Sequence, residues 1–196
     1  AKAKIDRLMT TKGKTKEEIA KSLAVFSAFN EGVNLFSSFA VLINFSRTDK
    51  MKGLGKIIEY SIKDESLHSE AGIWLYNTLV HEFPEIVTDE FKKDIYEAAR
   101  LTVELEDNFI DQAFEHGSVE GLDPADLKVF IRHRCNTKLQ DLGLKTNWKN
   151  IDKEALKRME WFDILSSGVI SQDFFAARET GYAKGNIIFA DDIFGE

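Results

Sequence analysis

A glutamate and a histidine stand three residues apart in the stretch KDESLHSEAG, at Glu65 and His68, with Asp64 directly before them. Side chains three apart on an α-helix lie on the same side of it, so a carboxylate oxygen and an imidazole nitrogen can bind one metal ion. The same spacing fits a hydrogen-bonded Glu–His pair or a solvated helix face. The pattern therefore gives a metal-ligand hypothesis that other residues must support.

A lone carboxylate elsewhere in the sequence supports that hypothesis. Glu31 is the one charged residue between positions 22 and 45, in an otherwise apolar stretch. Burial of an unpaired carboxylate costs several kcal/mol, and a bound cation would compensate it. Asp64, turned roughly 100° around the helix from Glu65, could hydrogen-bond the second nitrogen of another ligand histidine.

The number of Glu-x-x-His pairs is smaller than a complete site needs. In four-helix di-metal carboxylate proteins, two helices each give a Glu and two others each give a Glu-x-x-His pair. This sequence has one such pair, because no glutamate stands three residues before the other histidines: His81, His116 and His133. Half of the expected ligands are therefore missing.

Composition predicts an acidic, all-α protein of one domain. The 196 residues carry a net charge of −7, which argues against a nucleic-acid partner held by its phosphates. The single cysteine and the lack of a secretory signal favour a cytoplasmic setting. Residues 22–45 are apolar enough for a membrane span, but Asn30, Glu31 and Asn34 favour the centre of a helical bundle and no membrane.

Five helices are expected from capping residues and from apolar residues at helical spacing. On the second of them, Glu65 and His68 fall in register with the apolar stripe that runs from Leu54 to Leu79. The periodicity fails from Asp163 onward, which predicts an extended C-terminal tail. The expected helices are residues 15–47, 49–81, 88–116, 123–142 and 152–160.

The stretch FNEGVNLFSSFAVLINFSRTDKMKGLGKIIEYSIKDESLH, residues 29–68, resembles the second half of the class I ribonucleotide reductase small subunit. The resemblance rests on a Glu in an aromatic-rich helix, an M-x-G-x-x-K-I-I run and a D-E-x-L-H block. It continues through residues 103–144 and reaches SQDFFAARETGYAKG, and so covers most of the chain from about residue 20 onward. It implies part of a ferritin-like helical bundle over residues 1–160 and a tail over residues 161–196.

The resemblance also implies roles for particular residues. Glu31, Glu65 and His68 would be metal ligands, and Asp64 would lie on the radical-transfer route. Leu35 and Phe39, one and two turns beyond Glu31, would help form an apolar pocket around the radical. Tyr182 would relay the radical to the large subunit. The implied cofactor is a di-metal centre of iron, with manganese or a mixed pair as alternatives.

The implied partners follow from the same family. The acidic and aromatic residues 186–196 would dock the large catalytic subunit, which makes deoxyribonucleotides, and the small subunit would form a homodimer-type assembly. The family's first half, with its own Glu-x-x-His pair and radical-bearing Tyr, has no counterpart in the sequence. We therefore expect a separate N-terminal fragment of the small subunit to complete the cofactor, and the chain to be inactive alone.

Two other functions also fit the sequence. A ferritin-like di-metal oxidase or hydroxylase would keep the fold but need no relay tyrosine or docking tail. A metal-free helical interaction protein would use Glu31, Glu65 and His68 only to satisfy one another. Replacement of His68 separates this last alternative, because it would then change stability but no metal content.

Overall fold

The part of the chain that the computed structural model describes, residues 15–166, is mainly helical. No strand is present within this range, where a single isolated bridge joins Val119 and Leu122. The predicted all-α class is therefore confirmed. The elements in chain order are α2 (Lys16–Leu23), the π-helix η1 (Ala24–Glu31), α3 (Phe36–Arg47), α4 (Lys52–Glu82), the 3-10 turn η2 (Pro84–Ile86), α5 (Asp89–Phe114), α6 (Pro124–Asp141) and α7 (Lys153–Ser166).

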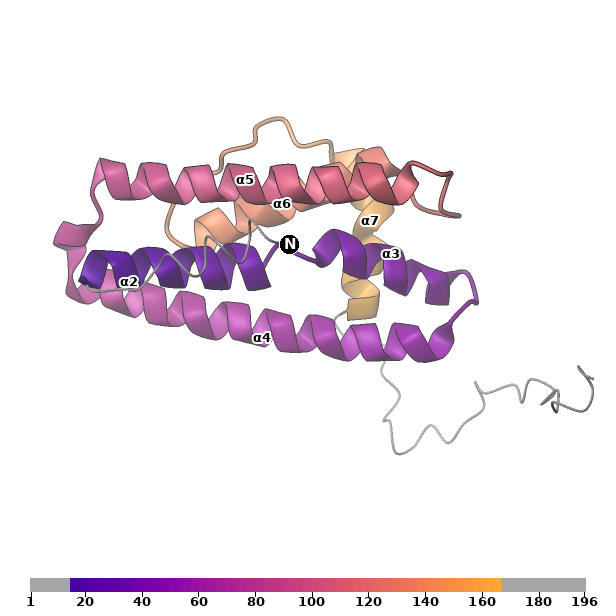
Figure 1. Cartoon of the computed structure of the whole chain (residues 1–196), viewed down its shortest axis with the longest axis horizontal. Helices are drawn as coiled ribbons and strands as arrows, with labels where there is room; N and C mark the ends of the chain where they lie inside the picture. Colours follow the sequence, from indigo (N-terminus) through magenta and orange to yellow (C-terminus); the bar gives the residue numbers. More distant parts are fainter. Residues whose placement is uncertain (1–14, 167–196) are drawn as a thin grey trace, which may run out of the picture.

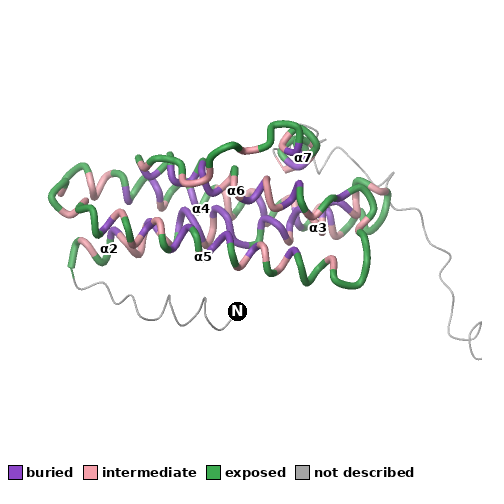
Figure 2. The backbone as a smooth tube through the Cα atoms, turned by 90° about the horizontal axis from the view of Figure 1, so that it is seen from above, coloured by how far each residue is buried: buried purple, intermediate pink, exposed green. Residues whose placement is uncertain are grey.

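The segment made of α2, η1 and α3 runs through the middle of the bundle (Figure 1). Helix α4 packs along one side of it, while α5 and α6 pack on the other, so that η1 contacts all three long helices. Helix α7 packs against α6 and crosses the bundle near α3. Buried backbone accordingly follows the inside of the bundle along its length (Figure 2).

The prediction of one continuous helix over residues 15–47 is wrong in its middle. The chain changes to π-helical winding at Ala24, leaves the helix after Glu31 and starts again at Phe36. Leu35, between the two parts, has a left-handed backbone with φ 74°. Wider winding and a left-handed residue are both features that local apolar periodicity does not reveal.

The predicted helix ends are mostly confirmed. Thr15 and Glu18 form a capping box, in which each side chain accepts a hydrogen bond from the other residue's backbone N–H. Asp123 caps α6, whose first residue is Pro124, and Gly143 beyond its end has φ 74°. Short-range chemistry therefore fixes the ends of these helices.

The face of α4 that enters the core differs from the predicted one. Its buried residues are Gly55, Ile58, Ile62, Ser69, Ile73 and Tyr76. Glu65 is only partly buried, His68 is exposed, and Leu75 keeps 47% of its surface exposed. Glu65 and His68 therefore lie at the edge of the buried face and do not interrupt it, because the apolar stripe passes through Ser69 instead.

The last described helix is longer than expected. Helix α7 continues to Ser166, six residues past the predicted end at 160, and Phe162 is fully buried in contact with Phe36 and Phe130. Predicted tail residues 161–166 are thus helical. Lys16–Arg47 has the length and apolarity of a membrane span, but 61% of its most apolar window is buried inside the bundle, as in a core helix.

Candidate metal site

Glu31, Glu65 and His68 come together in the structure. One ligand atom from each, a carboxylate oxygen or an imidazole nitrogen, lies within 4.8 Å of the other two. Glu31 is the last residue of η1, whereas Glu65 and His68 lie one turn apart on α4. The structure therefore brings the three predicted ligand residues together, and the cluster joins the two elements that contact each other most extensively.

The electrostatics of the cluster favour a cation. Burial raises the pKa of Glu31 above its ordinary value, the negative charge of Glu65 raises it further, and His68 opposes the shift. Two carboxylates that face each other repel when both are ionised, and a shared positive charge relieves that repulsion. Two carboxylates and one imidazole are also donors that iron and manganese accept. The residues present fit a metal.

Close packing fixes the backbone next to Glu31. A side chain at Gly32 would place its Cβ 2.8 Å from Ser69 Oγ on α4 and 3.0 Å from Lys138 Cδ on α6. Such distances leave no room for any residue but glycine unless its neighbours move. Glu31 therefore stands where η1 is pressed between two other helices.

Two charged residues that the sequence analysis did not single out also reach this region. Glu106 on α5 accepts hydrogen bonds from the backbone N–H groups of Leu35 and Ser37, and Arg134 on α6 donates one to the carbonyl of Gly32. Glu106 occupies a position on the apolar face of its helix, between Val103 and Ile110. A lone carboxylate in that register is the sequence signal that marks this position.

The other predicted site residues lie in different surroundings. Phe39 is 8% exposed and packs edge to face on Phe36, as a residue of a dry pocket would. Leu35 keeps 49% of its surface exposed. Its predicted place one helical turn beyond Glu31 is wrong, because the helix breaks between the two residues. Asp64 is exposed and outside the three-residue cluster. Tyr182 and residues 186–196 lie outside the described residues.

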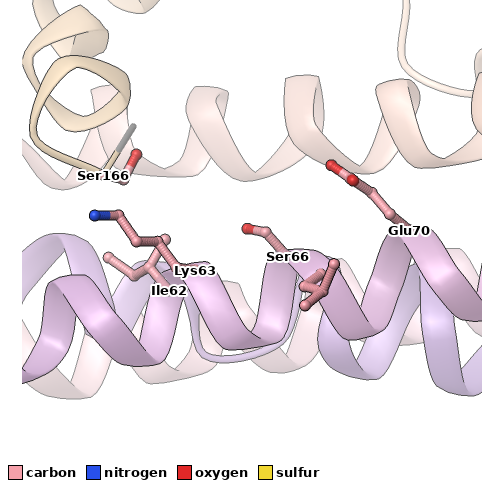
Figure 3. A pocket seen from close by; sticks show the side chains of 6 residues that line it. Ile62, Lys63, Ser66, Glu70 and Ser166 are labelled. Atoms are coloured by element: carbon pink, nitrogen blue, oxygen red, sulfur yellow. The ribbon is translucent and has the colours of Figure 1, made fainter. Parts of the chain in front are cut away.

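A separate pocket of about 300 Å³ opens beside the same helix, between α4 and the end of α7 (Figure 3). The side chains of Lys63, Ser66 and Glu70 point from α4 toward the gap that Ser166 borders. Lys63 is already paired with Glu59 on its own helix at 3.0 Å. The pocket has one carboxylate and no histidine, so it is not the candidate metal site.

The fold and the cluster together define a helical protein that can hold metal between carboxylates and an imidazole. The sequence profile of the ribonucleotide reductase small-chain family matches residues 1–154. The chain belongs to this family. Because the match begins at residue 1, the expectation that the resemblance starts near residue 20 is wrong, and the match does not support the prediction that the chain is only a C-terminal half.

Individual relatives agree with this assignment. A protein of Invertebrate iridescent virus 3, provisionally named as a ribonucleoside-diphosphate reductase small subunit, is 38% identical over 172 residues, which are 87% of this chain and 45% of the relative. A protein of Invertebrate iridescent virus 6, named in the same way, is 32% identical over 190 residues. The match covers 86% of this chain and 52% of the relative. The chain spans about half the length of the curated relatives it matches.

A solved structure shows the same fold. A crystal structure from Bacillus halodurans, provisionally assigned as a class I ribonucleotide reductase, superposes with a TM-score of 0.68 at 26% identity. The superposition covers 74% of this chain and 46% of that one. The prediction of the ferritin-like helical fold of ribonucleotide reductase small subunits is confirmed.

Proposed function

We propose that the chain is a small-subunit component of a class I ribonucleoside-diphosphate reductase that helps to hold a di-metal centre. The observation that carries the proposal is the cluster of Glu31, Glu65 and His68, whose three ligand atoms lie within 4.8 Å of one another. The family match and the names of the relatives support it. The reaction that this subunit would serve is the reduction of ribonucleoside diphosphates on a large catalytic subunit.

In this proposal each residue of the chain has a limited task. The carboxylates of Glu31 and Glu65 and the imidazole of His68 bind metal, and Phe39, buried against Phe36, helps to form the apolar pocket. Asp64 and Tyr182 carry the radical toward the large subunit, and residues 186–196 dock that subunit. The bound centre would supply oxygen activation and one-electron oxidation of a nearby group. Iron is the metal we propose first, with manganese as the alternative.

The described residues bring three ligands together, fewer than two metals of this class require. We propose that a further segment of the small subunit, in the same polypeptide or in a separate one, supplies the rest. The surface of α4 beside the cluster supports this, because Ile57, Leu67 and Trp74 are each more than 60% exposed there. Exposed apolar side chains gathered on the outer face of one helix are typical of an interaction site.

Metal analysis of the complete assembly tests the proposal. We expect about two metals per small-subunit unit when the chain is purified with the segment that completes the site, and deoxyribonucleotide formation when the large subunit is added. Deletion of residues 183–196 should abolish the reduction and leave the metal content unchanged. Unchanged reduction after this deletion would contradict the docking role, and would favour a self-contained oxidase of the same fold.

A further inference from the structure

The backbone break after Glu31 is held by charged side chains from two different helices. On its α3 side, Glu106 Oε1 accepts from Leu35 N–H at 3.2 Å, and Glu106 Oε2 accepts from Ser37 N–H at 3.2 Å and from Ser37 Oγ–H at 2.5 Å. Glu106 is 2% exposed. A buried carboxylate thus satisfies the free N–H groups at the start of α3, in the place of an N-cap.

The opposite side of the break carries a positive charge. Arg134 Nε donates to the carbonyl oxygen of Gly32 at 2.6 Å, directly after the end of η1. Its guanidinium also lies 3.3 Å from the ring centroid of Phe36, the first residue of α3. Burial lowers the pKa of Arg134 to about 10, and the charges of Asp163 and Asp141 oppose the shift, so the side chain stays charged at neutral pH.

These two residues match the local polarity of the backbone. A helix end with free carbonyls favours a cation, and a helix start with free N–H groups favours an anion. Arg134 is the cation at the end of η1, and Glu106 is the anion at the start of α3. The four residues Gly32–Leu35 lie between these two helix ends. The left-handed Leu35 is strained, and such a conformation persists only where its surroundings fix it.

We propose that Glu106 and Arg134 are positioning residues for Glu31, which fix the end of η1 and so hold the Glu31 carboxylate against Glu65 and His68. The inference rests on the proposed metal site for its purpose, but the clamp itself consists of contacts between described residues. Glu31 sits one residue from the Arg134 contact and four from the first Glu106 contact. A shift of the break would therefore move a ligand that belongs to a cluster only 4.8 Å across.

The test compares variants of the clamp with matched variants next to it. Glu106→Gln loses one acceptor oxygen and puts an amide N–H against a backbone N–H, and Arg134→Met keeps an apolar contact with Phe36 but loses the donor. Asp107→Asn and Arg132→Met are the controls. They break a neighbouring ion pair between the same two helices, in which Arg132 Nη1 lies 2.9 Å from Asp107 Oδ1.

Two readouts on the full chain decide the inference. The first is hydrogen exchange of the backbone amides of Leu35 and Ser37 without metal, which we expect to speed up at least tenfold in the clamp variants and less than twofold in the controls. The second is titration with Co²⁺ followed by its visible absorption. We expect the clamp variants to bind Co²⁺ about 10–100-fold more weakly than the controls, as loss of a residue that orients a ligand does.

Equal Co²⁺ affinity in Glu106→Gln and Asp107→Asn would overturn the positioning role. Should Glu106→Gln fail to fold, Arg134→Met tests the same break from α6. A failure of the proposed function is distinguishable from a failure of the clamp. If the proposed function is wrong, wild type and His68→Ala give the same Co²⁺ titration. The exchange of the Leu35 and Ser37 amides alone then decides whether the clamp exists, and unchanged exchange in both clamp variants rejects it.

Discussion

The two longest helices, α4 and α5, bury one face each but differ in what they present on the other. The exposed positions of α5 carry charged or small polar side chains, except for Ala113. The exposed positions of α4 include five large apolar residues: Ile57, Tyr60, Leu67, Trp74 and Leu75. The outer face of α5 is thus polar and suited to water, whereas that of α4, which carries Glu65 and His68, exposes apolar side chains.

That difference explains why the ligand pair lies at an edge. A residue pair on the buried face of α4 would be enclosed by the chain's own helices, as Ile73 and Tyr76 are. Glu65 and His68 instead lie between the buried face and the apolar outer face, next to Glu31 of η1. In the proposed function, this position lets them bind a metal together with ligands that approach from outside the described residues.

The largest expected effect concerns the ligands of α4 itself. His68→Ala should weaken Co²⁺ binding by more than about 100-fold, because loss of a direct ligand exceeds the loss caused by a residue behind it. His81→Ala, at the exposed end of the same helix, is the control and should leave binding unchanged. The measurement is the absorbance titration of the full chain. Equal binding by both variants would support the metal-free alternative.

Adjacent residues of α4 provide the next contrast, between its two faces. Ile73 is 6% exposed and Trp74 is 68% exposed. Ile73→Ala should lower the free energy of unfolding by about 2–5 kcal/mol through the cavity it leaves. Trp74→Ala should lower it by less than about 0.5 kcal/mol. Urea unfolding of the isolated chain checks both values, and a large loss at Trp74 would mean that the outer face is already packed.

The buried face of α4 should also show itself at alkaline pH. Burial raises the pKa of Tyr76 from 10.0 to about 12. The folded chain then keeps a proton that the unfolded chain releases. The contribution of Tyr76 to the free energy of unfolding is therefore full below pH 10 and is lost as the pH rises toward 12. Tyr76→Phe should reduce the slope of the free energy of unfolding against pH between pH 10 and 12 by the amount that one proton contributes.

Thermal unfolding across this pH range measures the slope for Tyr76→Phe. The matched variant Tyr60→Phe, on the outer face, controls for the loss of a hydroxyl at a position that is 43% exposed. An identical slope for wild type and Tyr76→Phe would show that Tyr76 is not enclosed as the structure has it.

The smallest effect is expected at the break beside the cluster. Leu35→Gly should change the free energy of unfolding by less than about 1 kcal/mol, because release of a left-handed strain of about 1–2 kcal/mol offsets lost packing and added chain entropy. Val33→Gly, two residues earlier and fully buried, should lower it by more than about 2 kcal/mol. A loss at Leu35 as large as that at Val33 would place the Leu35 side chain in the core.

The sequence was informative where the chemistry is local. Helix starts could be predicted at Thr15, Thr88 and Asp123. Each of these side-chain oxygens accepts a hydrogen bond from a backbone N–H of the turn that follows. The grouping of Glu65 with His68 followed from helical geometry. The lone charge of Glu31 suggested a compensating cation, and the resemblance to the ribonucleotide reductase small subunit placed it with the other two. These inferences needed no knowledge of distant contacts.

The break after Glu31 depends on distant contacts and could not be predicted in the same way. Glu106 reaches Ser37 across 69 residues of sequence, and Arg134 reaches Gly32 across 102. Apolar periodicity over residues 22–45 is the same whether the helix continues or winds as a π-helix. The place of Leu35 was wrong for this reason, and the length of α7 was underestimated because Phe162 is held by the core.

The proposed function depends on Glu31, Glu65 and His68 binding metal together at the edge of α4. Anomalous X-ray diffraction from crystals of the metal-loaded full chain, collected at the absorption edge of the added iron or cobalt, tests it most directly. We expect an anomalous peak about 2.0–2.2 Å from a carboxylate oxygen of Glu31, one of Glu65 and a ring nitrogen of His68. A peak bound by other residues, or crystals with bound metal and no peak at this cluster, would contradict it.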